Sequence, residues 1–326
     1  MGNIDIDGAQ RPSRRARDGS KTQMAAHFFK RYPPSAKRHT FLRNAMYDQR
    51  DPPINPNQTE IPDPGTVTAE LKDMALSMDV DIVGVAAFKG EFAFADAELP
   101  DHDRVIVLGK TMPYDIMADI GPKSQSVVHQ TYFDLDDIGL RFAQQIGAYG
   151  YGARLQPNGG DFPLIPYAYL AGLGELGKHG SLISPELGSS FRLSALSTNM
   201  PINADGPVDE GIEEVCASCN VCERFCPGGA IRPDKFTVNG VERWHVDTPS
   251  CEPYFYKMYG CKICLMVCPF NNKGNLKEAF KPTAEVIRKA KDAAGLLKLI
   301  EERTDMKFED FDYSLDDDEE LTGSIR

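Results

Sequence analysis

All eight cysteines of this chain fall between residues 216 and 268, in two groups. The first group is Cys216-x2-Cys219-x2-Cys222-x3-Cys226, and the second is Cys251-x9-Cys261-x2-Cys264-x3-Cys268, each followed by proline. Two-residue gaps let three thiolates bind one iron–sulfur cubane, and a three-residue gap before proline turns the fourth thiolate toward a neighbouring cluster. The spacing therefore predicts two [4Fe–4S] clusters that transfer electrons.

The same spacing predicts which cysteines share a cluster. We expect one cluster to be bound by Cys216, Cys219, Cys222 and Cys268, and the other by Cys251, Cys261, Cys264 and Cys226. Zinc also binds CxxC pairs, but three thiolates at this spacing that end in Cys-Pro are not typical of a zinc site. Disulfides need an oxidising compartment, and we find no secretory signal before the cysteines.

Length and charge limit the functions that the rest of the chain can have. Its 326 residues can form one large domain and a small one. A net charge of -12 and a pI near 5.0 argue against nucleic acid as a partner. No run of 18 apolar residues is present, so we expect no membrane span. Arg14-Arg15 lacks the apolar stretch of an export signal, and we predict a cytoplasmic protein.

The residues before the cysteines predict alternating helices and strands. Residues 1–65 are polar and rich in proline, which favours an extended arm with at most a short helix near Met24–Tyr32. Apolar residues at helical spacing predict helices over Val67–Met78 and Ser124–Tyr149. Apolar runs predict strands at Val80–Ala87, Arg104–Gly109, Tyr151–Leu155, Ser181–Ile183 and Phe191–Thr198, and a helix or helix pair is expected at Lys277–Arg303. This alternation indicates an α/β layer.

A glycine-rich segment, AGLGELGKHG, occupies residues 171–180. It matches the GxGxxG fingerprint of dinucleotide-binding folds at Gly172, Gly174 and Gly177, but that fingerprint should follow a strand and open a helix. Here a fourth glycine, Gly180, and a predicted strand follow, so the dinucleotide interpretation fits poorly. Four glycines would let backbone amides approach a large, flat group.

The string AGLGELGKHGSLISPELGSSFRLSALSTNMPI precedes the first cysteine group, and WHVD, a lone Cys251 and CxxCxxxCPFN follow it. Together these motifs resemble the cobalamin-dependent reductive dehalogenases, over roughly residues 66 to 275. Epoxyqueuosine reductases are the near relatives, because they share the cobalamin core and both clusters. Their corresponding loop usually lacks the GLGE pattern of this chain.

The resemblance implies an α/β (α+β) fold, with a nitroreductase-like corrinoid-binding core and a C-terminal two-[4Fe–4S] ferredoxin-like domain. We expect an arm at 1–65, the catalytic core at 66–205, the two-cluster domain at 206–275, and a helix with an acidic tail at 276–326. It also implies cobalamin as cofactor and replacement of a carbon–halogen bond by carbon–hydrogen. The expected corrinoid contacts are Gly172, Leu173, Gly174, Glu175, Gly177, Lys178, His179 and Gly180.

Three residues match the active-site pattern of that family. Tyr132 would donate the proton, Arg192 would hold the leaving halide or the phenolate, and Asn158 would orient the tyrosine hydroxyl. His129 and Tyr151 lie near enough in the sequence to be alternatives to Tyr132. Each residue also has an ordinary structural explanation: a core tyrosine, an ion-paired arginine and a turn asparagine.

The expected substrate is an organohalide, in a non-respiratory, catabolic role. We see no fused reductase domain, so a separate ferredoxin or reductase is expected to supply electrons. Two alternatives stay open. One is epoxyqueuosine reduction, which the acidic charge opposes because its substrate is a tRNA. The other is a two-cluster ferredoxin that carries electrons and binds no corrinoid.

Overall fold

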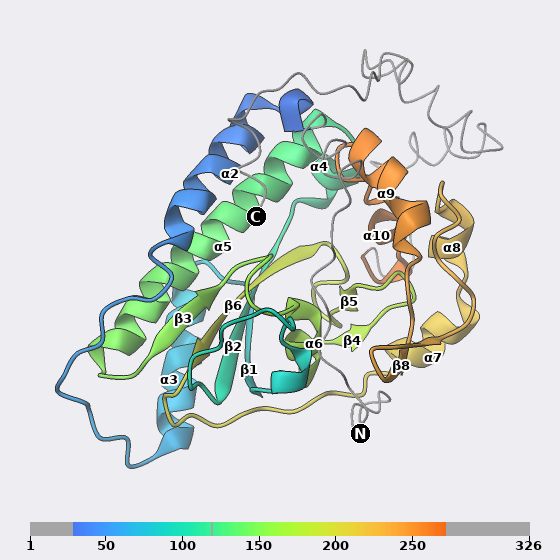
Figure 1. The fold of residues 1–326 in the computed structure, drawn as a ribbon. Helices are drawn as coiled ribbons and strands as arrows, with labels where there is room; N and C mark the ends of the chain where they lie inside the picture. Colours follow the sequence, from blue (N-terminus) through green and yellow to red (C-terminus); the bar gives the residue numbers. More distant parts are fainter. Residues whose placement is uncertain (1–28, 119, 272–326) are drawn as a thin grey trace.

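The computed structural model describes residues 29–118 and 120–271. Its centre is a four-stranded sheet of β1 (Ile82–Ala87), β2 (Arg104–Thr111), β6 (Phe191–Thr198) and β3 (Ala153–Gln156). The spatial order is β1-β2-β6-β3 and every neighbouring pair is antiparallel, so that Ile106 in β2 lies between Val85 and Leu196 (Figure 1). The strands predicted at these four places are confirmed, and the mixed α/β (α+β) class with them.

Helices cover both faces of the sheet. Alternate residues of β2 point to opposite faces. Ile106 and Leu108 pack against α3 (Pro64–Ser77) and α5 (Pro122–Ala148), whereas Val105 and Val107 pack against α6 (Leu164–Leu170). Both predicted helices, α3 and α5, are present, and each has proline in its first turn, where the missing N–H costs nothing. This two-sided core holds β6 and α5 at a fixed spacing.

The N-terminal segment differs from the extended arm that the sequence predicts. Residues 34–47 form α2 (Pro34–Tyr47), which lies alongside α5 (Figure 1). This helix buries only Ala36, so its sequence has no apolar stripe to reveal it. Of the helix predicted near Met24–Tyr32, residues 29–31 are helical and 24–28 lie outside the described residues. The helix predicted at Lys277–Arg303 also lies outside them.

The cysteine segment forms short elements beside one end of the sheet (Figure 1). The other elements of the described part are η1 (Gly90–Phe92), α4 (Tyr114–Ala118), β4 (Glu175–Leu176), β5 (Leu182–Ile183), α7 (Ile212–Ser218), α8 (Val221–Phe225), β7 (Phe236–Val238), β8 (Val241–Arg243), α9 (Thr248–Lys257), α10 (Ile263–Met266) and η2 (Pro269–Asn271). Within residues 29–118 and 120–271, no helix is long and apolar enough to cross a membrane.

Candidate redox and catalytic site

Three cysteines close together in the chain and a fourth, 46 residues further on, line one hollow. These cysteines are Cys216, Cys219, Cys222 and Cys268. They come from α7, the turn after it, α8 and the segment just after α10, and none of the four forms a disulfide. A group of four thiols around one hollow fits a [4Fe–4S] cluster, whose ligands are four thiolates. The structure thus brings together the first predicted ligand set.

The other four cysteines also lie close to one another. Burial raises the pKa of Cys261 to about 12, with smaller contributions from Cys251 and Cys226. Burial likewise raises the pKa of Cys264 well above its ordinary value, and Cys261 and Cys226 add to the effect. Thiols that are so reluctant to ionise alone are stabilised as thiolates by a metal centre, and they release protons when it binds.

The glycine-rich segment touches the cysteine module directly. Glu175 is buried, and its carboxylate accepts hydrogen bonds from the backbone N–H groups of Glu210, Ile212 and Glu213 at the start of α7. An acidic side chain at this place satisfies the unpaired N–H groups of a helix start. Because α7 carries Cys216, Glu175 fixes the first cysteine of the module.

Lys178 and His179 continue this contact. Both side chains are buried and both line the hollow of the first cysteine set. Burial lowers the pKa of His179 to about 4. Contact of Gly172–Gly180 with a corrinoid stays a prediction, since the contacts made here by Glu175, Lys178 and His179 are with the cysteine module.

The four glycines of this segment approach the chain itself. A Cβ at Gly172 would lie 2.6 Å from the Gly206 carbonyl oxygen, and one at Gly180 would lie 2.8 Å from a Val246 methyl carbon. At Gly174, where φ is +150°, a Cβ would overlap the Ile183 carbonyl oxygen. A Cβ at Gly177 would meet the Ile183 side chain. These four positions therefore need glycine for close packing of the chain, and contact of their backbone amides with a flat group stays a prediction.

Tyr132 and Arg192, two of the three predicted catalytic residues, lie together. Tyr132 is on α5, and Arg192 is the second residue of β6. The guanidinium carbon of Arg192 lies 5.5 Å from the centre of the Tyr132 ring. Arg192 donates to the Phe191 carbonyl, while its buried Nε has no partner among the described residues. A second guanidinium, from Arg43 on α2, lies 4.7 Å from the same ring. The phenol ring thus has two cations beside it.

A buried carboxylate holds Arg43 in place. Asp136 lies one helical turn after Tyr132 and accepts from Arg43 Nε at 2.6 Å and from Ser194 Oγ at 3.1 Å. Ser194 is two residues after Arg192, on the same face of β6. Burial raises the pKa of Asp136, and Arg43 and Ser194 oppose that rise. Two contacts therefore join β6 to α5, Arg192 with Tyr132 and Ser194 with Asp136. Arg43 of α2 takes part in both, because it contacts Tyr132 and Asp136.

His129, an alternative to Tyr132 in the sequence, is held on both ring nitrogens. Nδ1 lies 2.9 Å from Thr40 Oγ1 on α2, and Nε2 lies 2.8 Å from the side-chain nitrogen of Gln125. Burial lowers the pKa of His129 to about 4, and Arg43 adds to this effect. The imidazole is therefore neutral near pH 7. The other alternative, Tyr151, donates its hydroxyl to the Thr59 carbonyl in the core between the sheet and α5.

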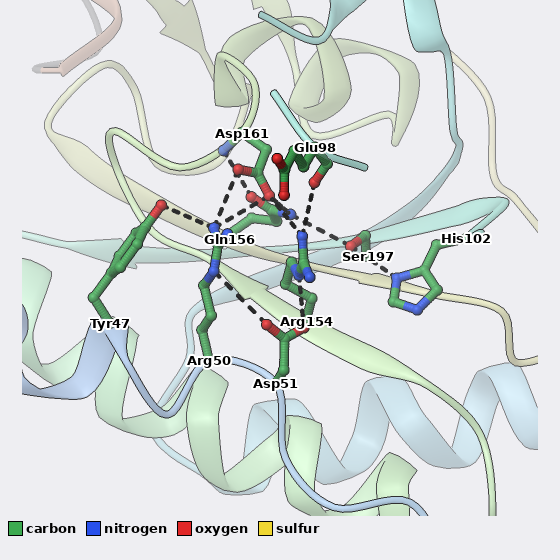
Figure 2. Close-up of polar contacts among 9 residues, drawn as sticks. All are labelled: Tyr47, Arg50, Asp51, Glu98, His102, Arg154, Gln156, Asp161 and Ser197. Carbon is green, nitrogen blue, oxygen red and sulfur yellow. Dashed lines mark hydrogen bonds and ion pairs between the residues drawn. The ribbon is translucent and has the colours of Figure 1, made fainter. Parts of the chain in front are cut away.

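Asn158 lies apart from the other two predicted residues. It is exposed in the turn after β3, at the same end of the sheet as Arg192, and no described contact joins it to Arg192 or Tyr132. The turn is anchored by Asp161, which is buried between Arg50 and Arg154 (Figure 2). Arg50 follows α2, so the N-terminal segment fixes this turn as well as Tyr132.

Three cysteines of the second set and Tyr132 pack against one apolar cluster. Val128 and Ile263 are among its buried residues, and the partly buried residues around it include Tyr132, Cys226, Cys261 and Cys264. The predicted proton donor and the predicted iron–sulfur ligands therefore contact the same cluster of packed side chains.

Sequence reasoning missed Arg43, Asp136 and the capping function of Glu175. Asp136 was visible in the sequence, because Gln125, His129, Tyr132 and Asp136 repeat at intervals of four, three and four on α5 and so share one face. Arg43 carried no such signal, since it lies in a polar helix that the sequence does not reveal.

Some buried polar atoms of the described part could bind the corrinoid that the resemblance implies. Buried polar atoms without a hydrogen-bond partner in the described part include Arg192 Nε next to Tyr132, Ser190 Oγ just before β6 and Gln125 Oε1 two turns before Tyr132 on α5. Buried polar groups normally have partners, so these three are of the kind that a bound molecule would satisfy. These atoms could therefore bind polar groups of a ligand, whereas the glycines of 172–180 have no room for side chains.

Comparison with known proteins gives the family context. The family model of the 4Fe-4S dicluster domain matches residues 215–272. The tetrachloroethene reductive dehalogenase of Sulfurospirillum multivorans is 37% identical over 121 residues, which cover 34% of this chain and 24% of that protein. The chain is a homologue of the reductive dehalogenases. The epoxyqueuosine reductase of Lactococcus garvieae (strain Lg2) is also related, with 38% identity over 128 residues, which cover 37% of this chain and 35% of that protein.

The fold agrees with this homology. The solved structure of the catabolic reductive dehalogenase NpRdhA has a TM-score of 0.75 to this chain at 24% identity, and it matches 93% of this chain and 48% of its own. This homologue of the reductive dehalogenases therefore spans about half of NpRdhA and a smaller share of the curated relatives. These relatives are oxidoreductases, and the likeness to NpRdhA extends to the fold.

Proposed function

We propose that this protein is a corrinoid-dependent reductive dehalogenase. The organohalide takes up two electrons and one proton, its carbon–halogen bond breaks, a carbon–hydrogen bond forms, and halide leaves. The electrons come one at a time from a separate ferredoxin or reductase, through two [4Fe–4S] clusters bound by the eight cysteines. The proposal includes a division into a catalytic core at 66–205 and a two-cluster domain at 206–275. It also includes a cytoplasmic location.

One observation carries the proposal. Tyr132 has the guanidinium groups of Arg43 and Arg192 close to its ring, and it packs against the apolar cluster that also contacts Cys226 and Cys261. Proton delivery and electron delivery are needed at the same substrate atom. A two-cluster electron carrier needs neither a half-buried tyrosine nor two cations beside it.

The residues of the site have separate roles in this proposal. Tyr132 donates the proton to the carbon that loses the halogen. Arg192 stabilises the departing halide and, together with Arg43, the phenolate left on Tyr132. Asp136 keeps Arg43 in position. Asn158 is exposed in the present structure, so it would contact the Tyr132 hydroxyl only when substrate is bound.

The corrinoid would be held by polar groups on α5 and at the start of β6 that have buried atoms without partners in the described part, namely Gln125, Ser190 and Arg192. When bound, it supplies the low-potential metal centre at which the carbon–halogen bond is reduced. The packed core around Tyr132 and Val128 keeps water away from that centre on the protein side.

The substrate is proposed to be a small organohalide. NpRdhA has been solved in complex with 3-bromo-4-hydroxybenzoic acid, and the relative from S. multivorans is named for tetrachloroethene. Both compounds are therefore suitable probes. A halogenated phenol is the better probe, because its ionised oxygen could pair with Arg43 or Arg192, the two cations beside Tyr132.

Anaerobic reconstitution with cobalamin, iron and sulfide tests the proposal. Desalted protein should retain cobalamin absorption bands, and with a low-potential reductant it should release bromide from 3-bromo-4-hydroxybenzoic acid or chloride from tetrachloroethene. Protein that holds iron and sulfide but no cobalamin would instead be an electron carrier.

Epoxyqueuosine reduction is the second candidate, because the L. garvieae relative reaches 38% identity. It predicts loss of the epoxide oxygen from a tRNA, detectable by mass spectrometry of the nucleosides. The net charge of -12 opposes binding of that polyanion.

A further inference from the structure

Lys178 is a buried cation for which the described residues provide no carboxylate. Its side chain is 1% exposed. Its ammonium group donates to Asn220 Oδ1 at 2.8 Å and contacts the Ala217 carbonyl at 3.4 Å, and it lies 4.9 Å from the centre of the Trp244 ring. All of these partners are formally neutral. A buried charge is expensive unless an opposite charge or a metal centre compensates it.

The hollow lined by Cys216, Cys219, Cys222 and Cys268 lies next to this ammonium group, because Lys178 forms part of its wall. The backbone N–H of Lys178 also donates to the Cys216 thiol. A [4Fe–4S] cluster with four thiolate ligands has a net negative charge, which grows by one unit on reduction. The cluster therefore supplies the counter-charge that Lys178 lacks.

His179 offers a second contact with the same hollow. Its Nδ1 accepts a hydrogen bond from the backbone N–H of Ser181 at 3.2 Å, so the neutral ring has its proton on Nε2. That Nε2 atom is buried and has no partner in the described part of the chain. An N–H group aimed into a cluster site can donate to a cluster or cysteine sulfur, and such bonds raise reduction potentials.

We propose that Lys178 and His179 set the reduction potential of the cluster bound by Cys216, Cys219, Cys222 and Cys268. Lys178 acts through its charge and His179 through an N–H···S hydrogen bond. The inference rests on the iron–sulfur part of the proposed function and on none of its corrinoid chemistry. Reduction transfers one electron from an external donor to the cluster, and the ammonium stabilises the reduced form more than the oxidised form.

Potentiometric titration with dithionite, followed by EPR of the reconstituted protein, tests this inference. Lys178→Gln keeps a hydrogen-bond donor and removes the charge. We expect the equilibrium constant for one-electron reduction of this cluster to fall at least tenfold, which is about 59 mV toward lower potential. Lys178→Arg should stay near the wild-type value. His179→Phe should shift the same cluster in the same direction by a smaller amount.

Two further variants keep the test decisive if Lys178→Gln does not assemble the cluster. Asn220→Asp places a carboxylate beside the intact ammonium and should lower the potential in the same way. Lys235→Gln is the matched control, because Lys235 lies 5.5 Å from the Trp244 ring but is partly exposed and paired with Glu213. Its removal should leave both potentials unchanged.

The cluster concerned is identified as the one whose signal Cys219→Ser alters. If Lys178→Gln or Asn220→Asp loads that cluster with an unchanged potential, or if Lys235→Gln shifts it equally, the proposal for Lys178 is wrong. An unchanged potential in His179→Phe would remove His179 from it. Wild-type protein that binds no iron and sulfide would contradict the proposed function itself.

Discussion

The guanidinium carbon of Arg192 lies 5.5 Å from the centre of the Tyr132 ring, on a strand and a helix that the core holds at a fixed spacing. Arg43 lies 4.7 Å from the same ring and reaches it from α2. This arrangement combines a phenol that can donate a proton with two groups that stabilise negative charge. It depends on α2, α5 and β6, which come from separate parts of the chain. A substitution in any of the three should therefore change activity or stability measurably.

Tyr132→Phe should slow halide release by a factor of about 10² to 10⁴, because it removes the proposed general acid and leaves the ring in place. The measurement is halide release by reconstituted protein, together with its cobalamin and iron content. Tyr151→Phe is the matched control. It loses one hydrogen bond to the Thr59 carbonyl, about 1 kcal/mol of stability, and should release halide normally. Equal rates for Tyr132→Phe and wild type would exclude Tyr132 as the proton donor.

Arg43→Met should destabilise the fold by about 3 to 5 kcal/mol, because Asp136 would remain as a buried carboxylate without its cation. The side chains of Arg43 and Asp136 are 14% and 3% exposed, so solvent cannot replace the lost partner. Combining Arg43→Met with Asp136→Asn should recover part of the loss. Urea unfolding followed by circular dichroism measures both. A double variant no more stable than Arg43→Met would mean that the pair is not coupled.

Much of the fold could be predicted from the sequence, because its signals are local. β6 lies at the predicted residues Phe191–Thr198, and α5 begins two residues before the predicted helix, at Pro122. Apolar period and proline position decide such elements without knowledge of the rest of the chain. Cysteine spacing is equally local, and it predicted which four cysteines surround the hollow.

The remaining parts depend on tertiary contacts that leave no periodic signal. α2 is polar on nearly all sides, and its interactions are single contacts such as Thr40 with His129 and Arg43 with Asp136. Glu175 seemed part of a ligand-binding loop, but its carboxylate caps α7, more than thirty residues further along the chain. Whether a glycine faces a ligand or the chain itself is likewise decided by tertiary packing.

Gly174→Ala should prevent stable folding or reduce stability by several kcal/mol, because its methyl group would overlap the Ile183 carbonyl oxygen at a backbone φ of +150°. Gly206→Ala is the control, since a Cβ at Gly206 meets nothing within 4 Å. It should change stability by less than about 0.5 kcal/mol. Thermal unfolding of both variants checks this. A fully stable Gly174→Ala protein would show that the segment has more space than the structure gives it.

Asp161→Asn should destabilise the protein by about 3 kcal/mol, because it leaves Arg50 and Arg154 facing each other without the buried carboxylate between them. The turn that carries Asn158 should then be cut faster in limited proteolysis. Asp103→Asn breaks a pair in which Asp103 is 67% exposed, and it should cost less than about 1 kcal/mol. Similar losses in the two variants would contradict a buried anchor at Asp161.

The stability of the protein should fall as the pH decreases from 6.5 toward 4, in part because of His129. Its folded-state pKa is lowered to about 4 from an ordinary value of 6.5, so between these limits the unfolded chain binds a proton that the folded chain does not. Between pH 7.5 and pH 5 this difference costs about 2 kcal/mol. His129→Gln should lose that much less stability over the same interval. Thr40→Val keeps the buried imidazole and should retain the acid loss, so identical pH profiles for His129→Gln and Thr40→Val in anaerobic urea unfolding would show that His129 is not the titrating group.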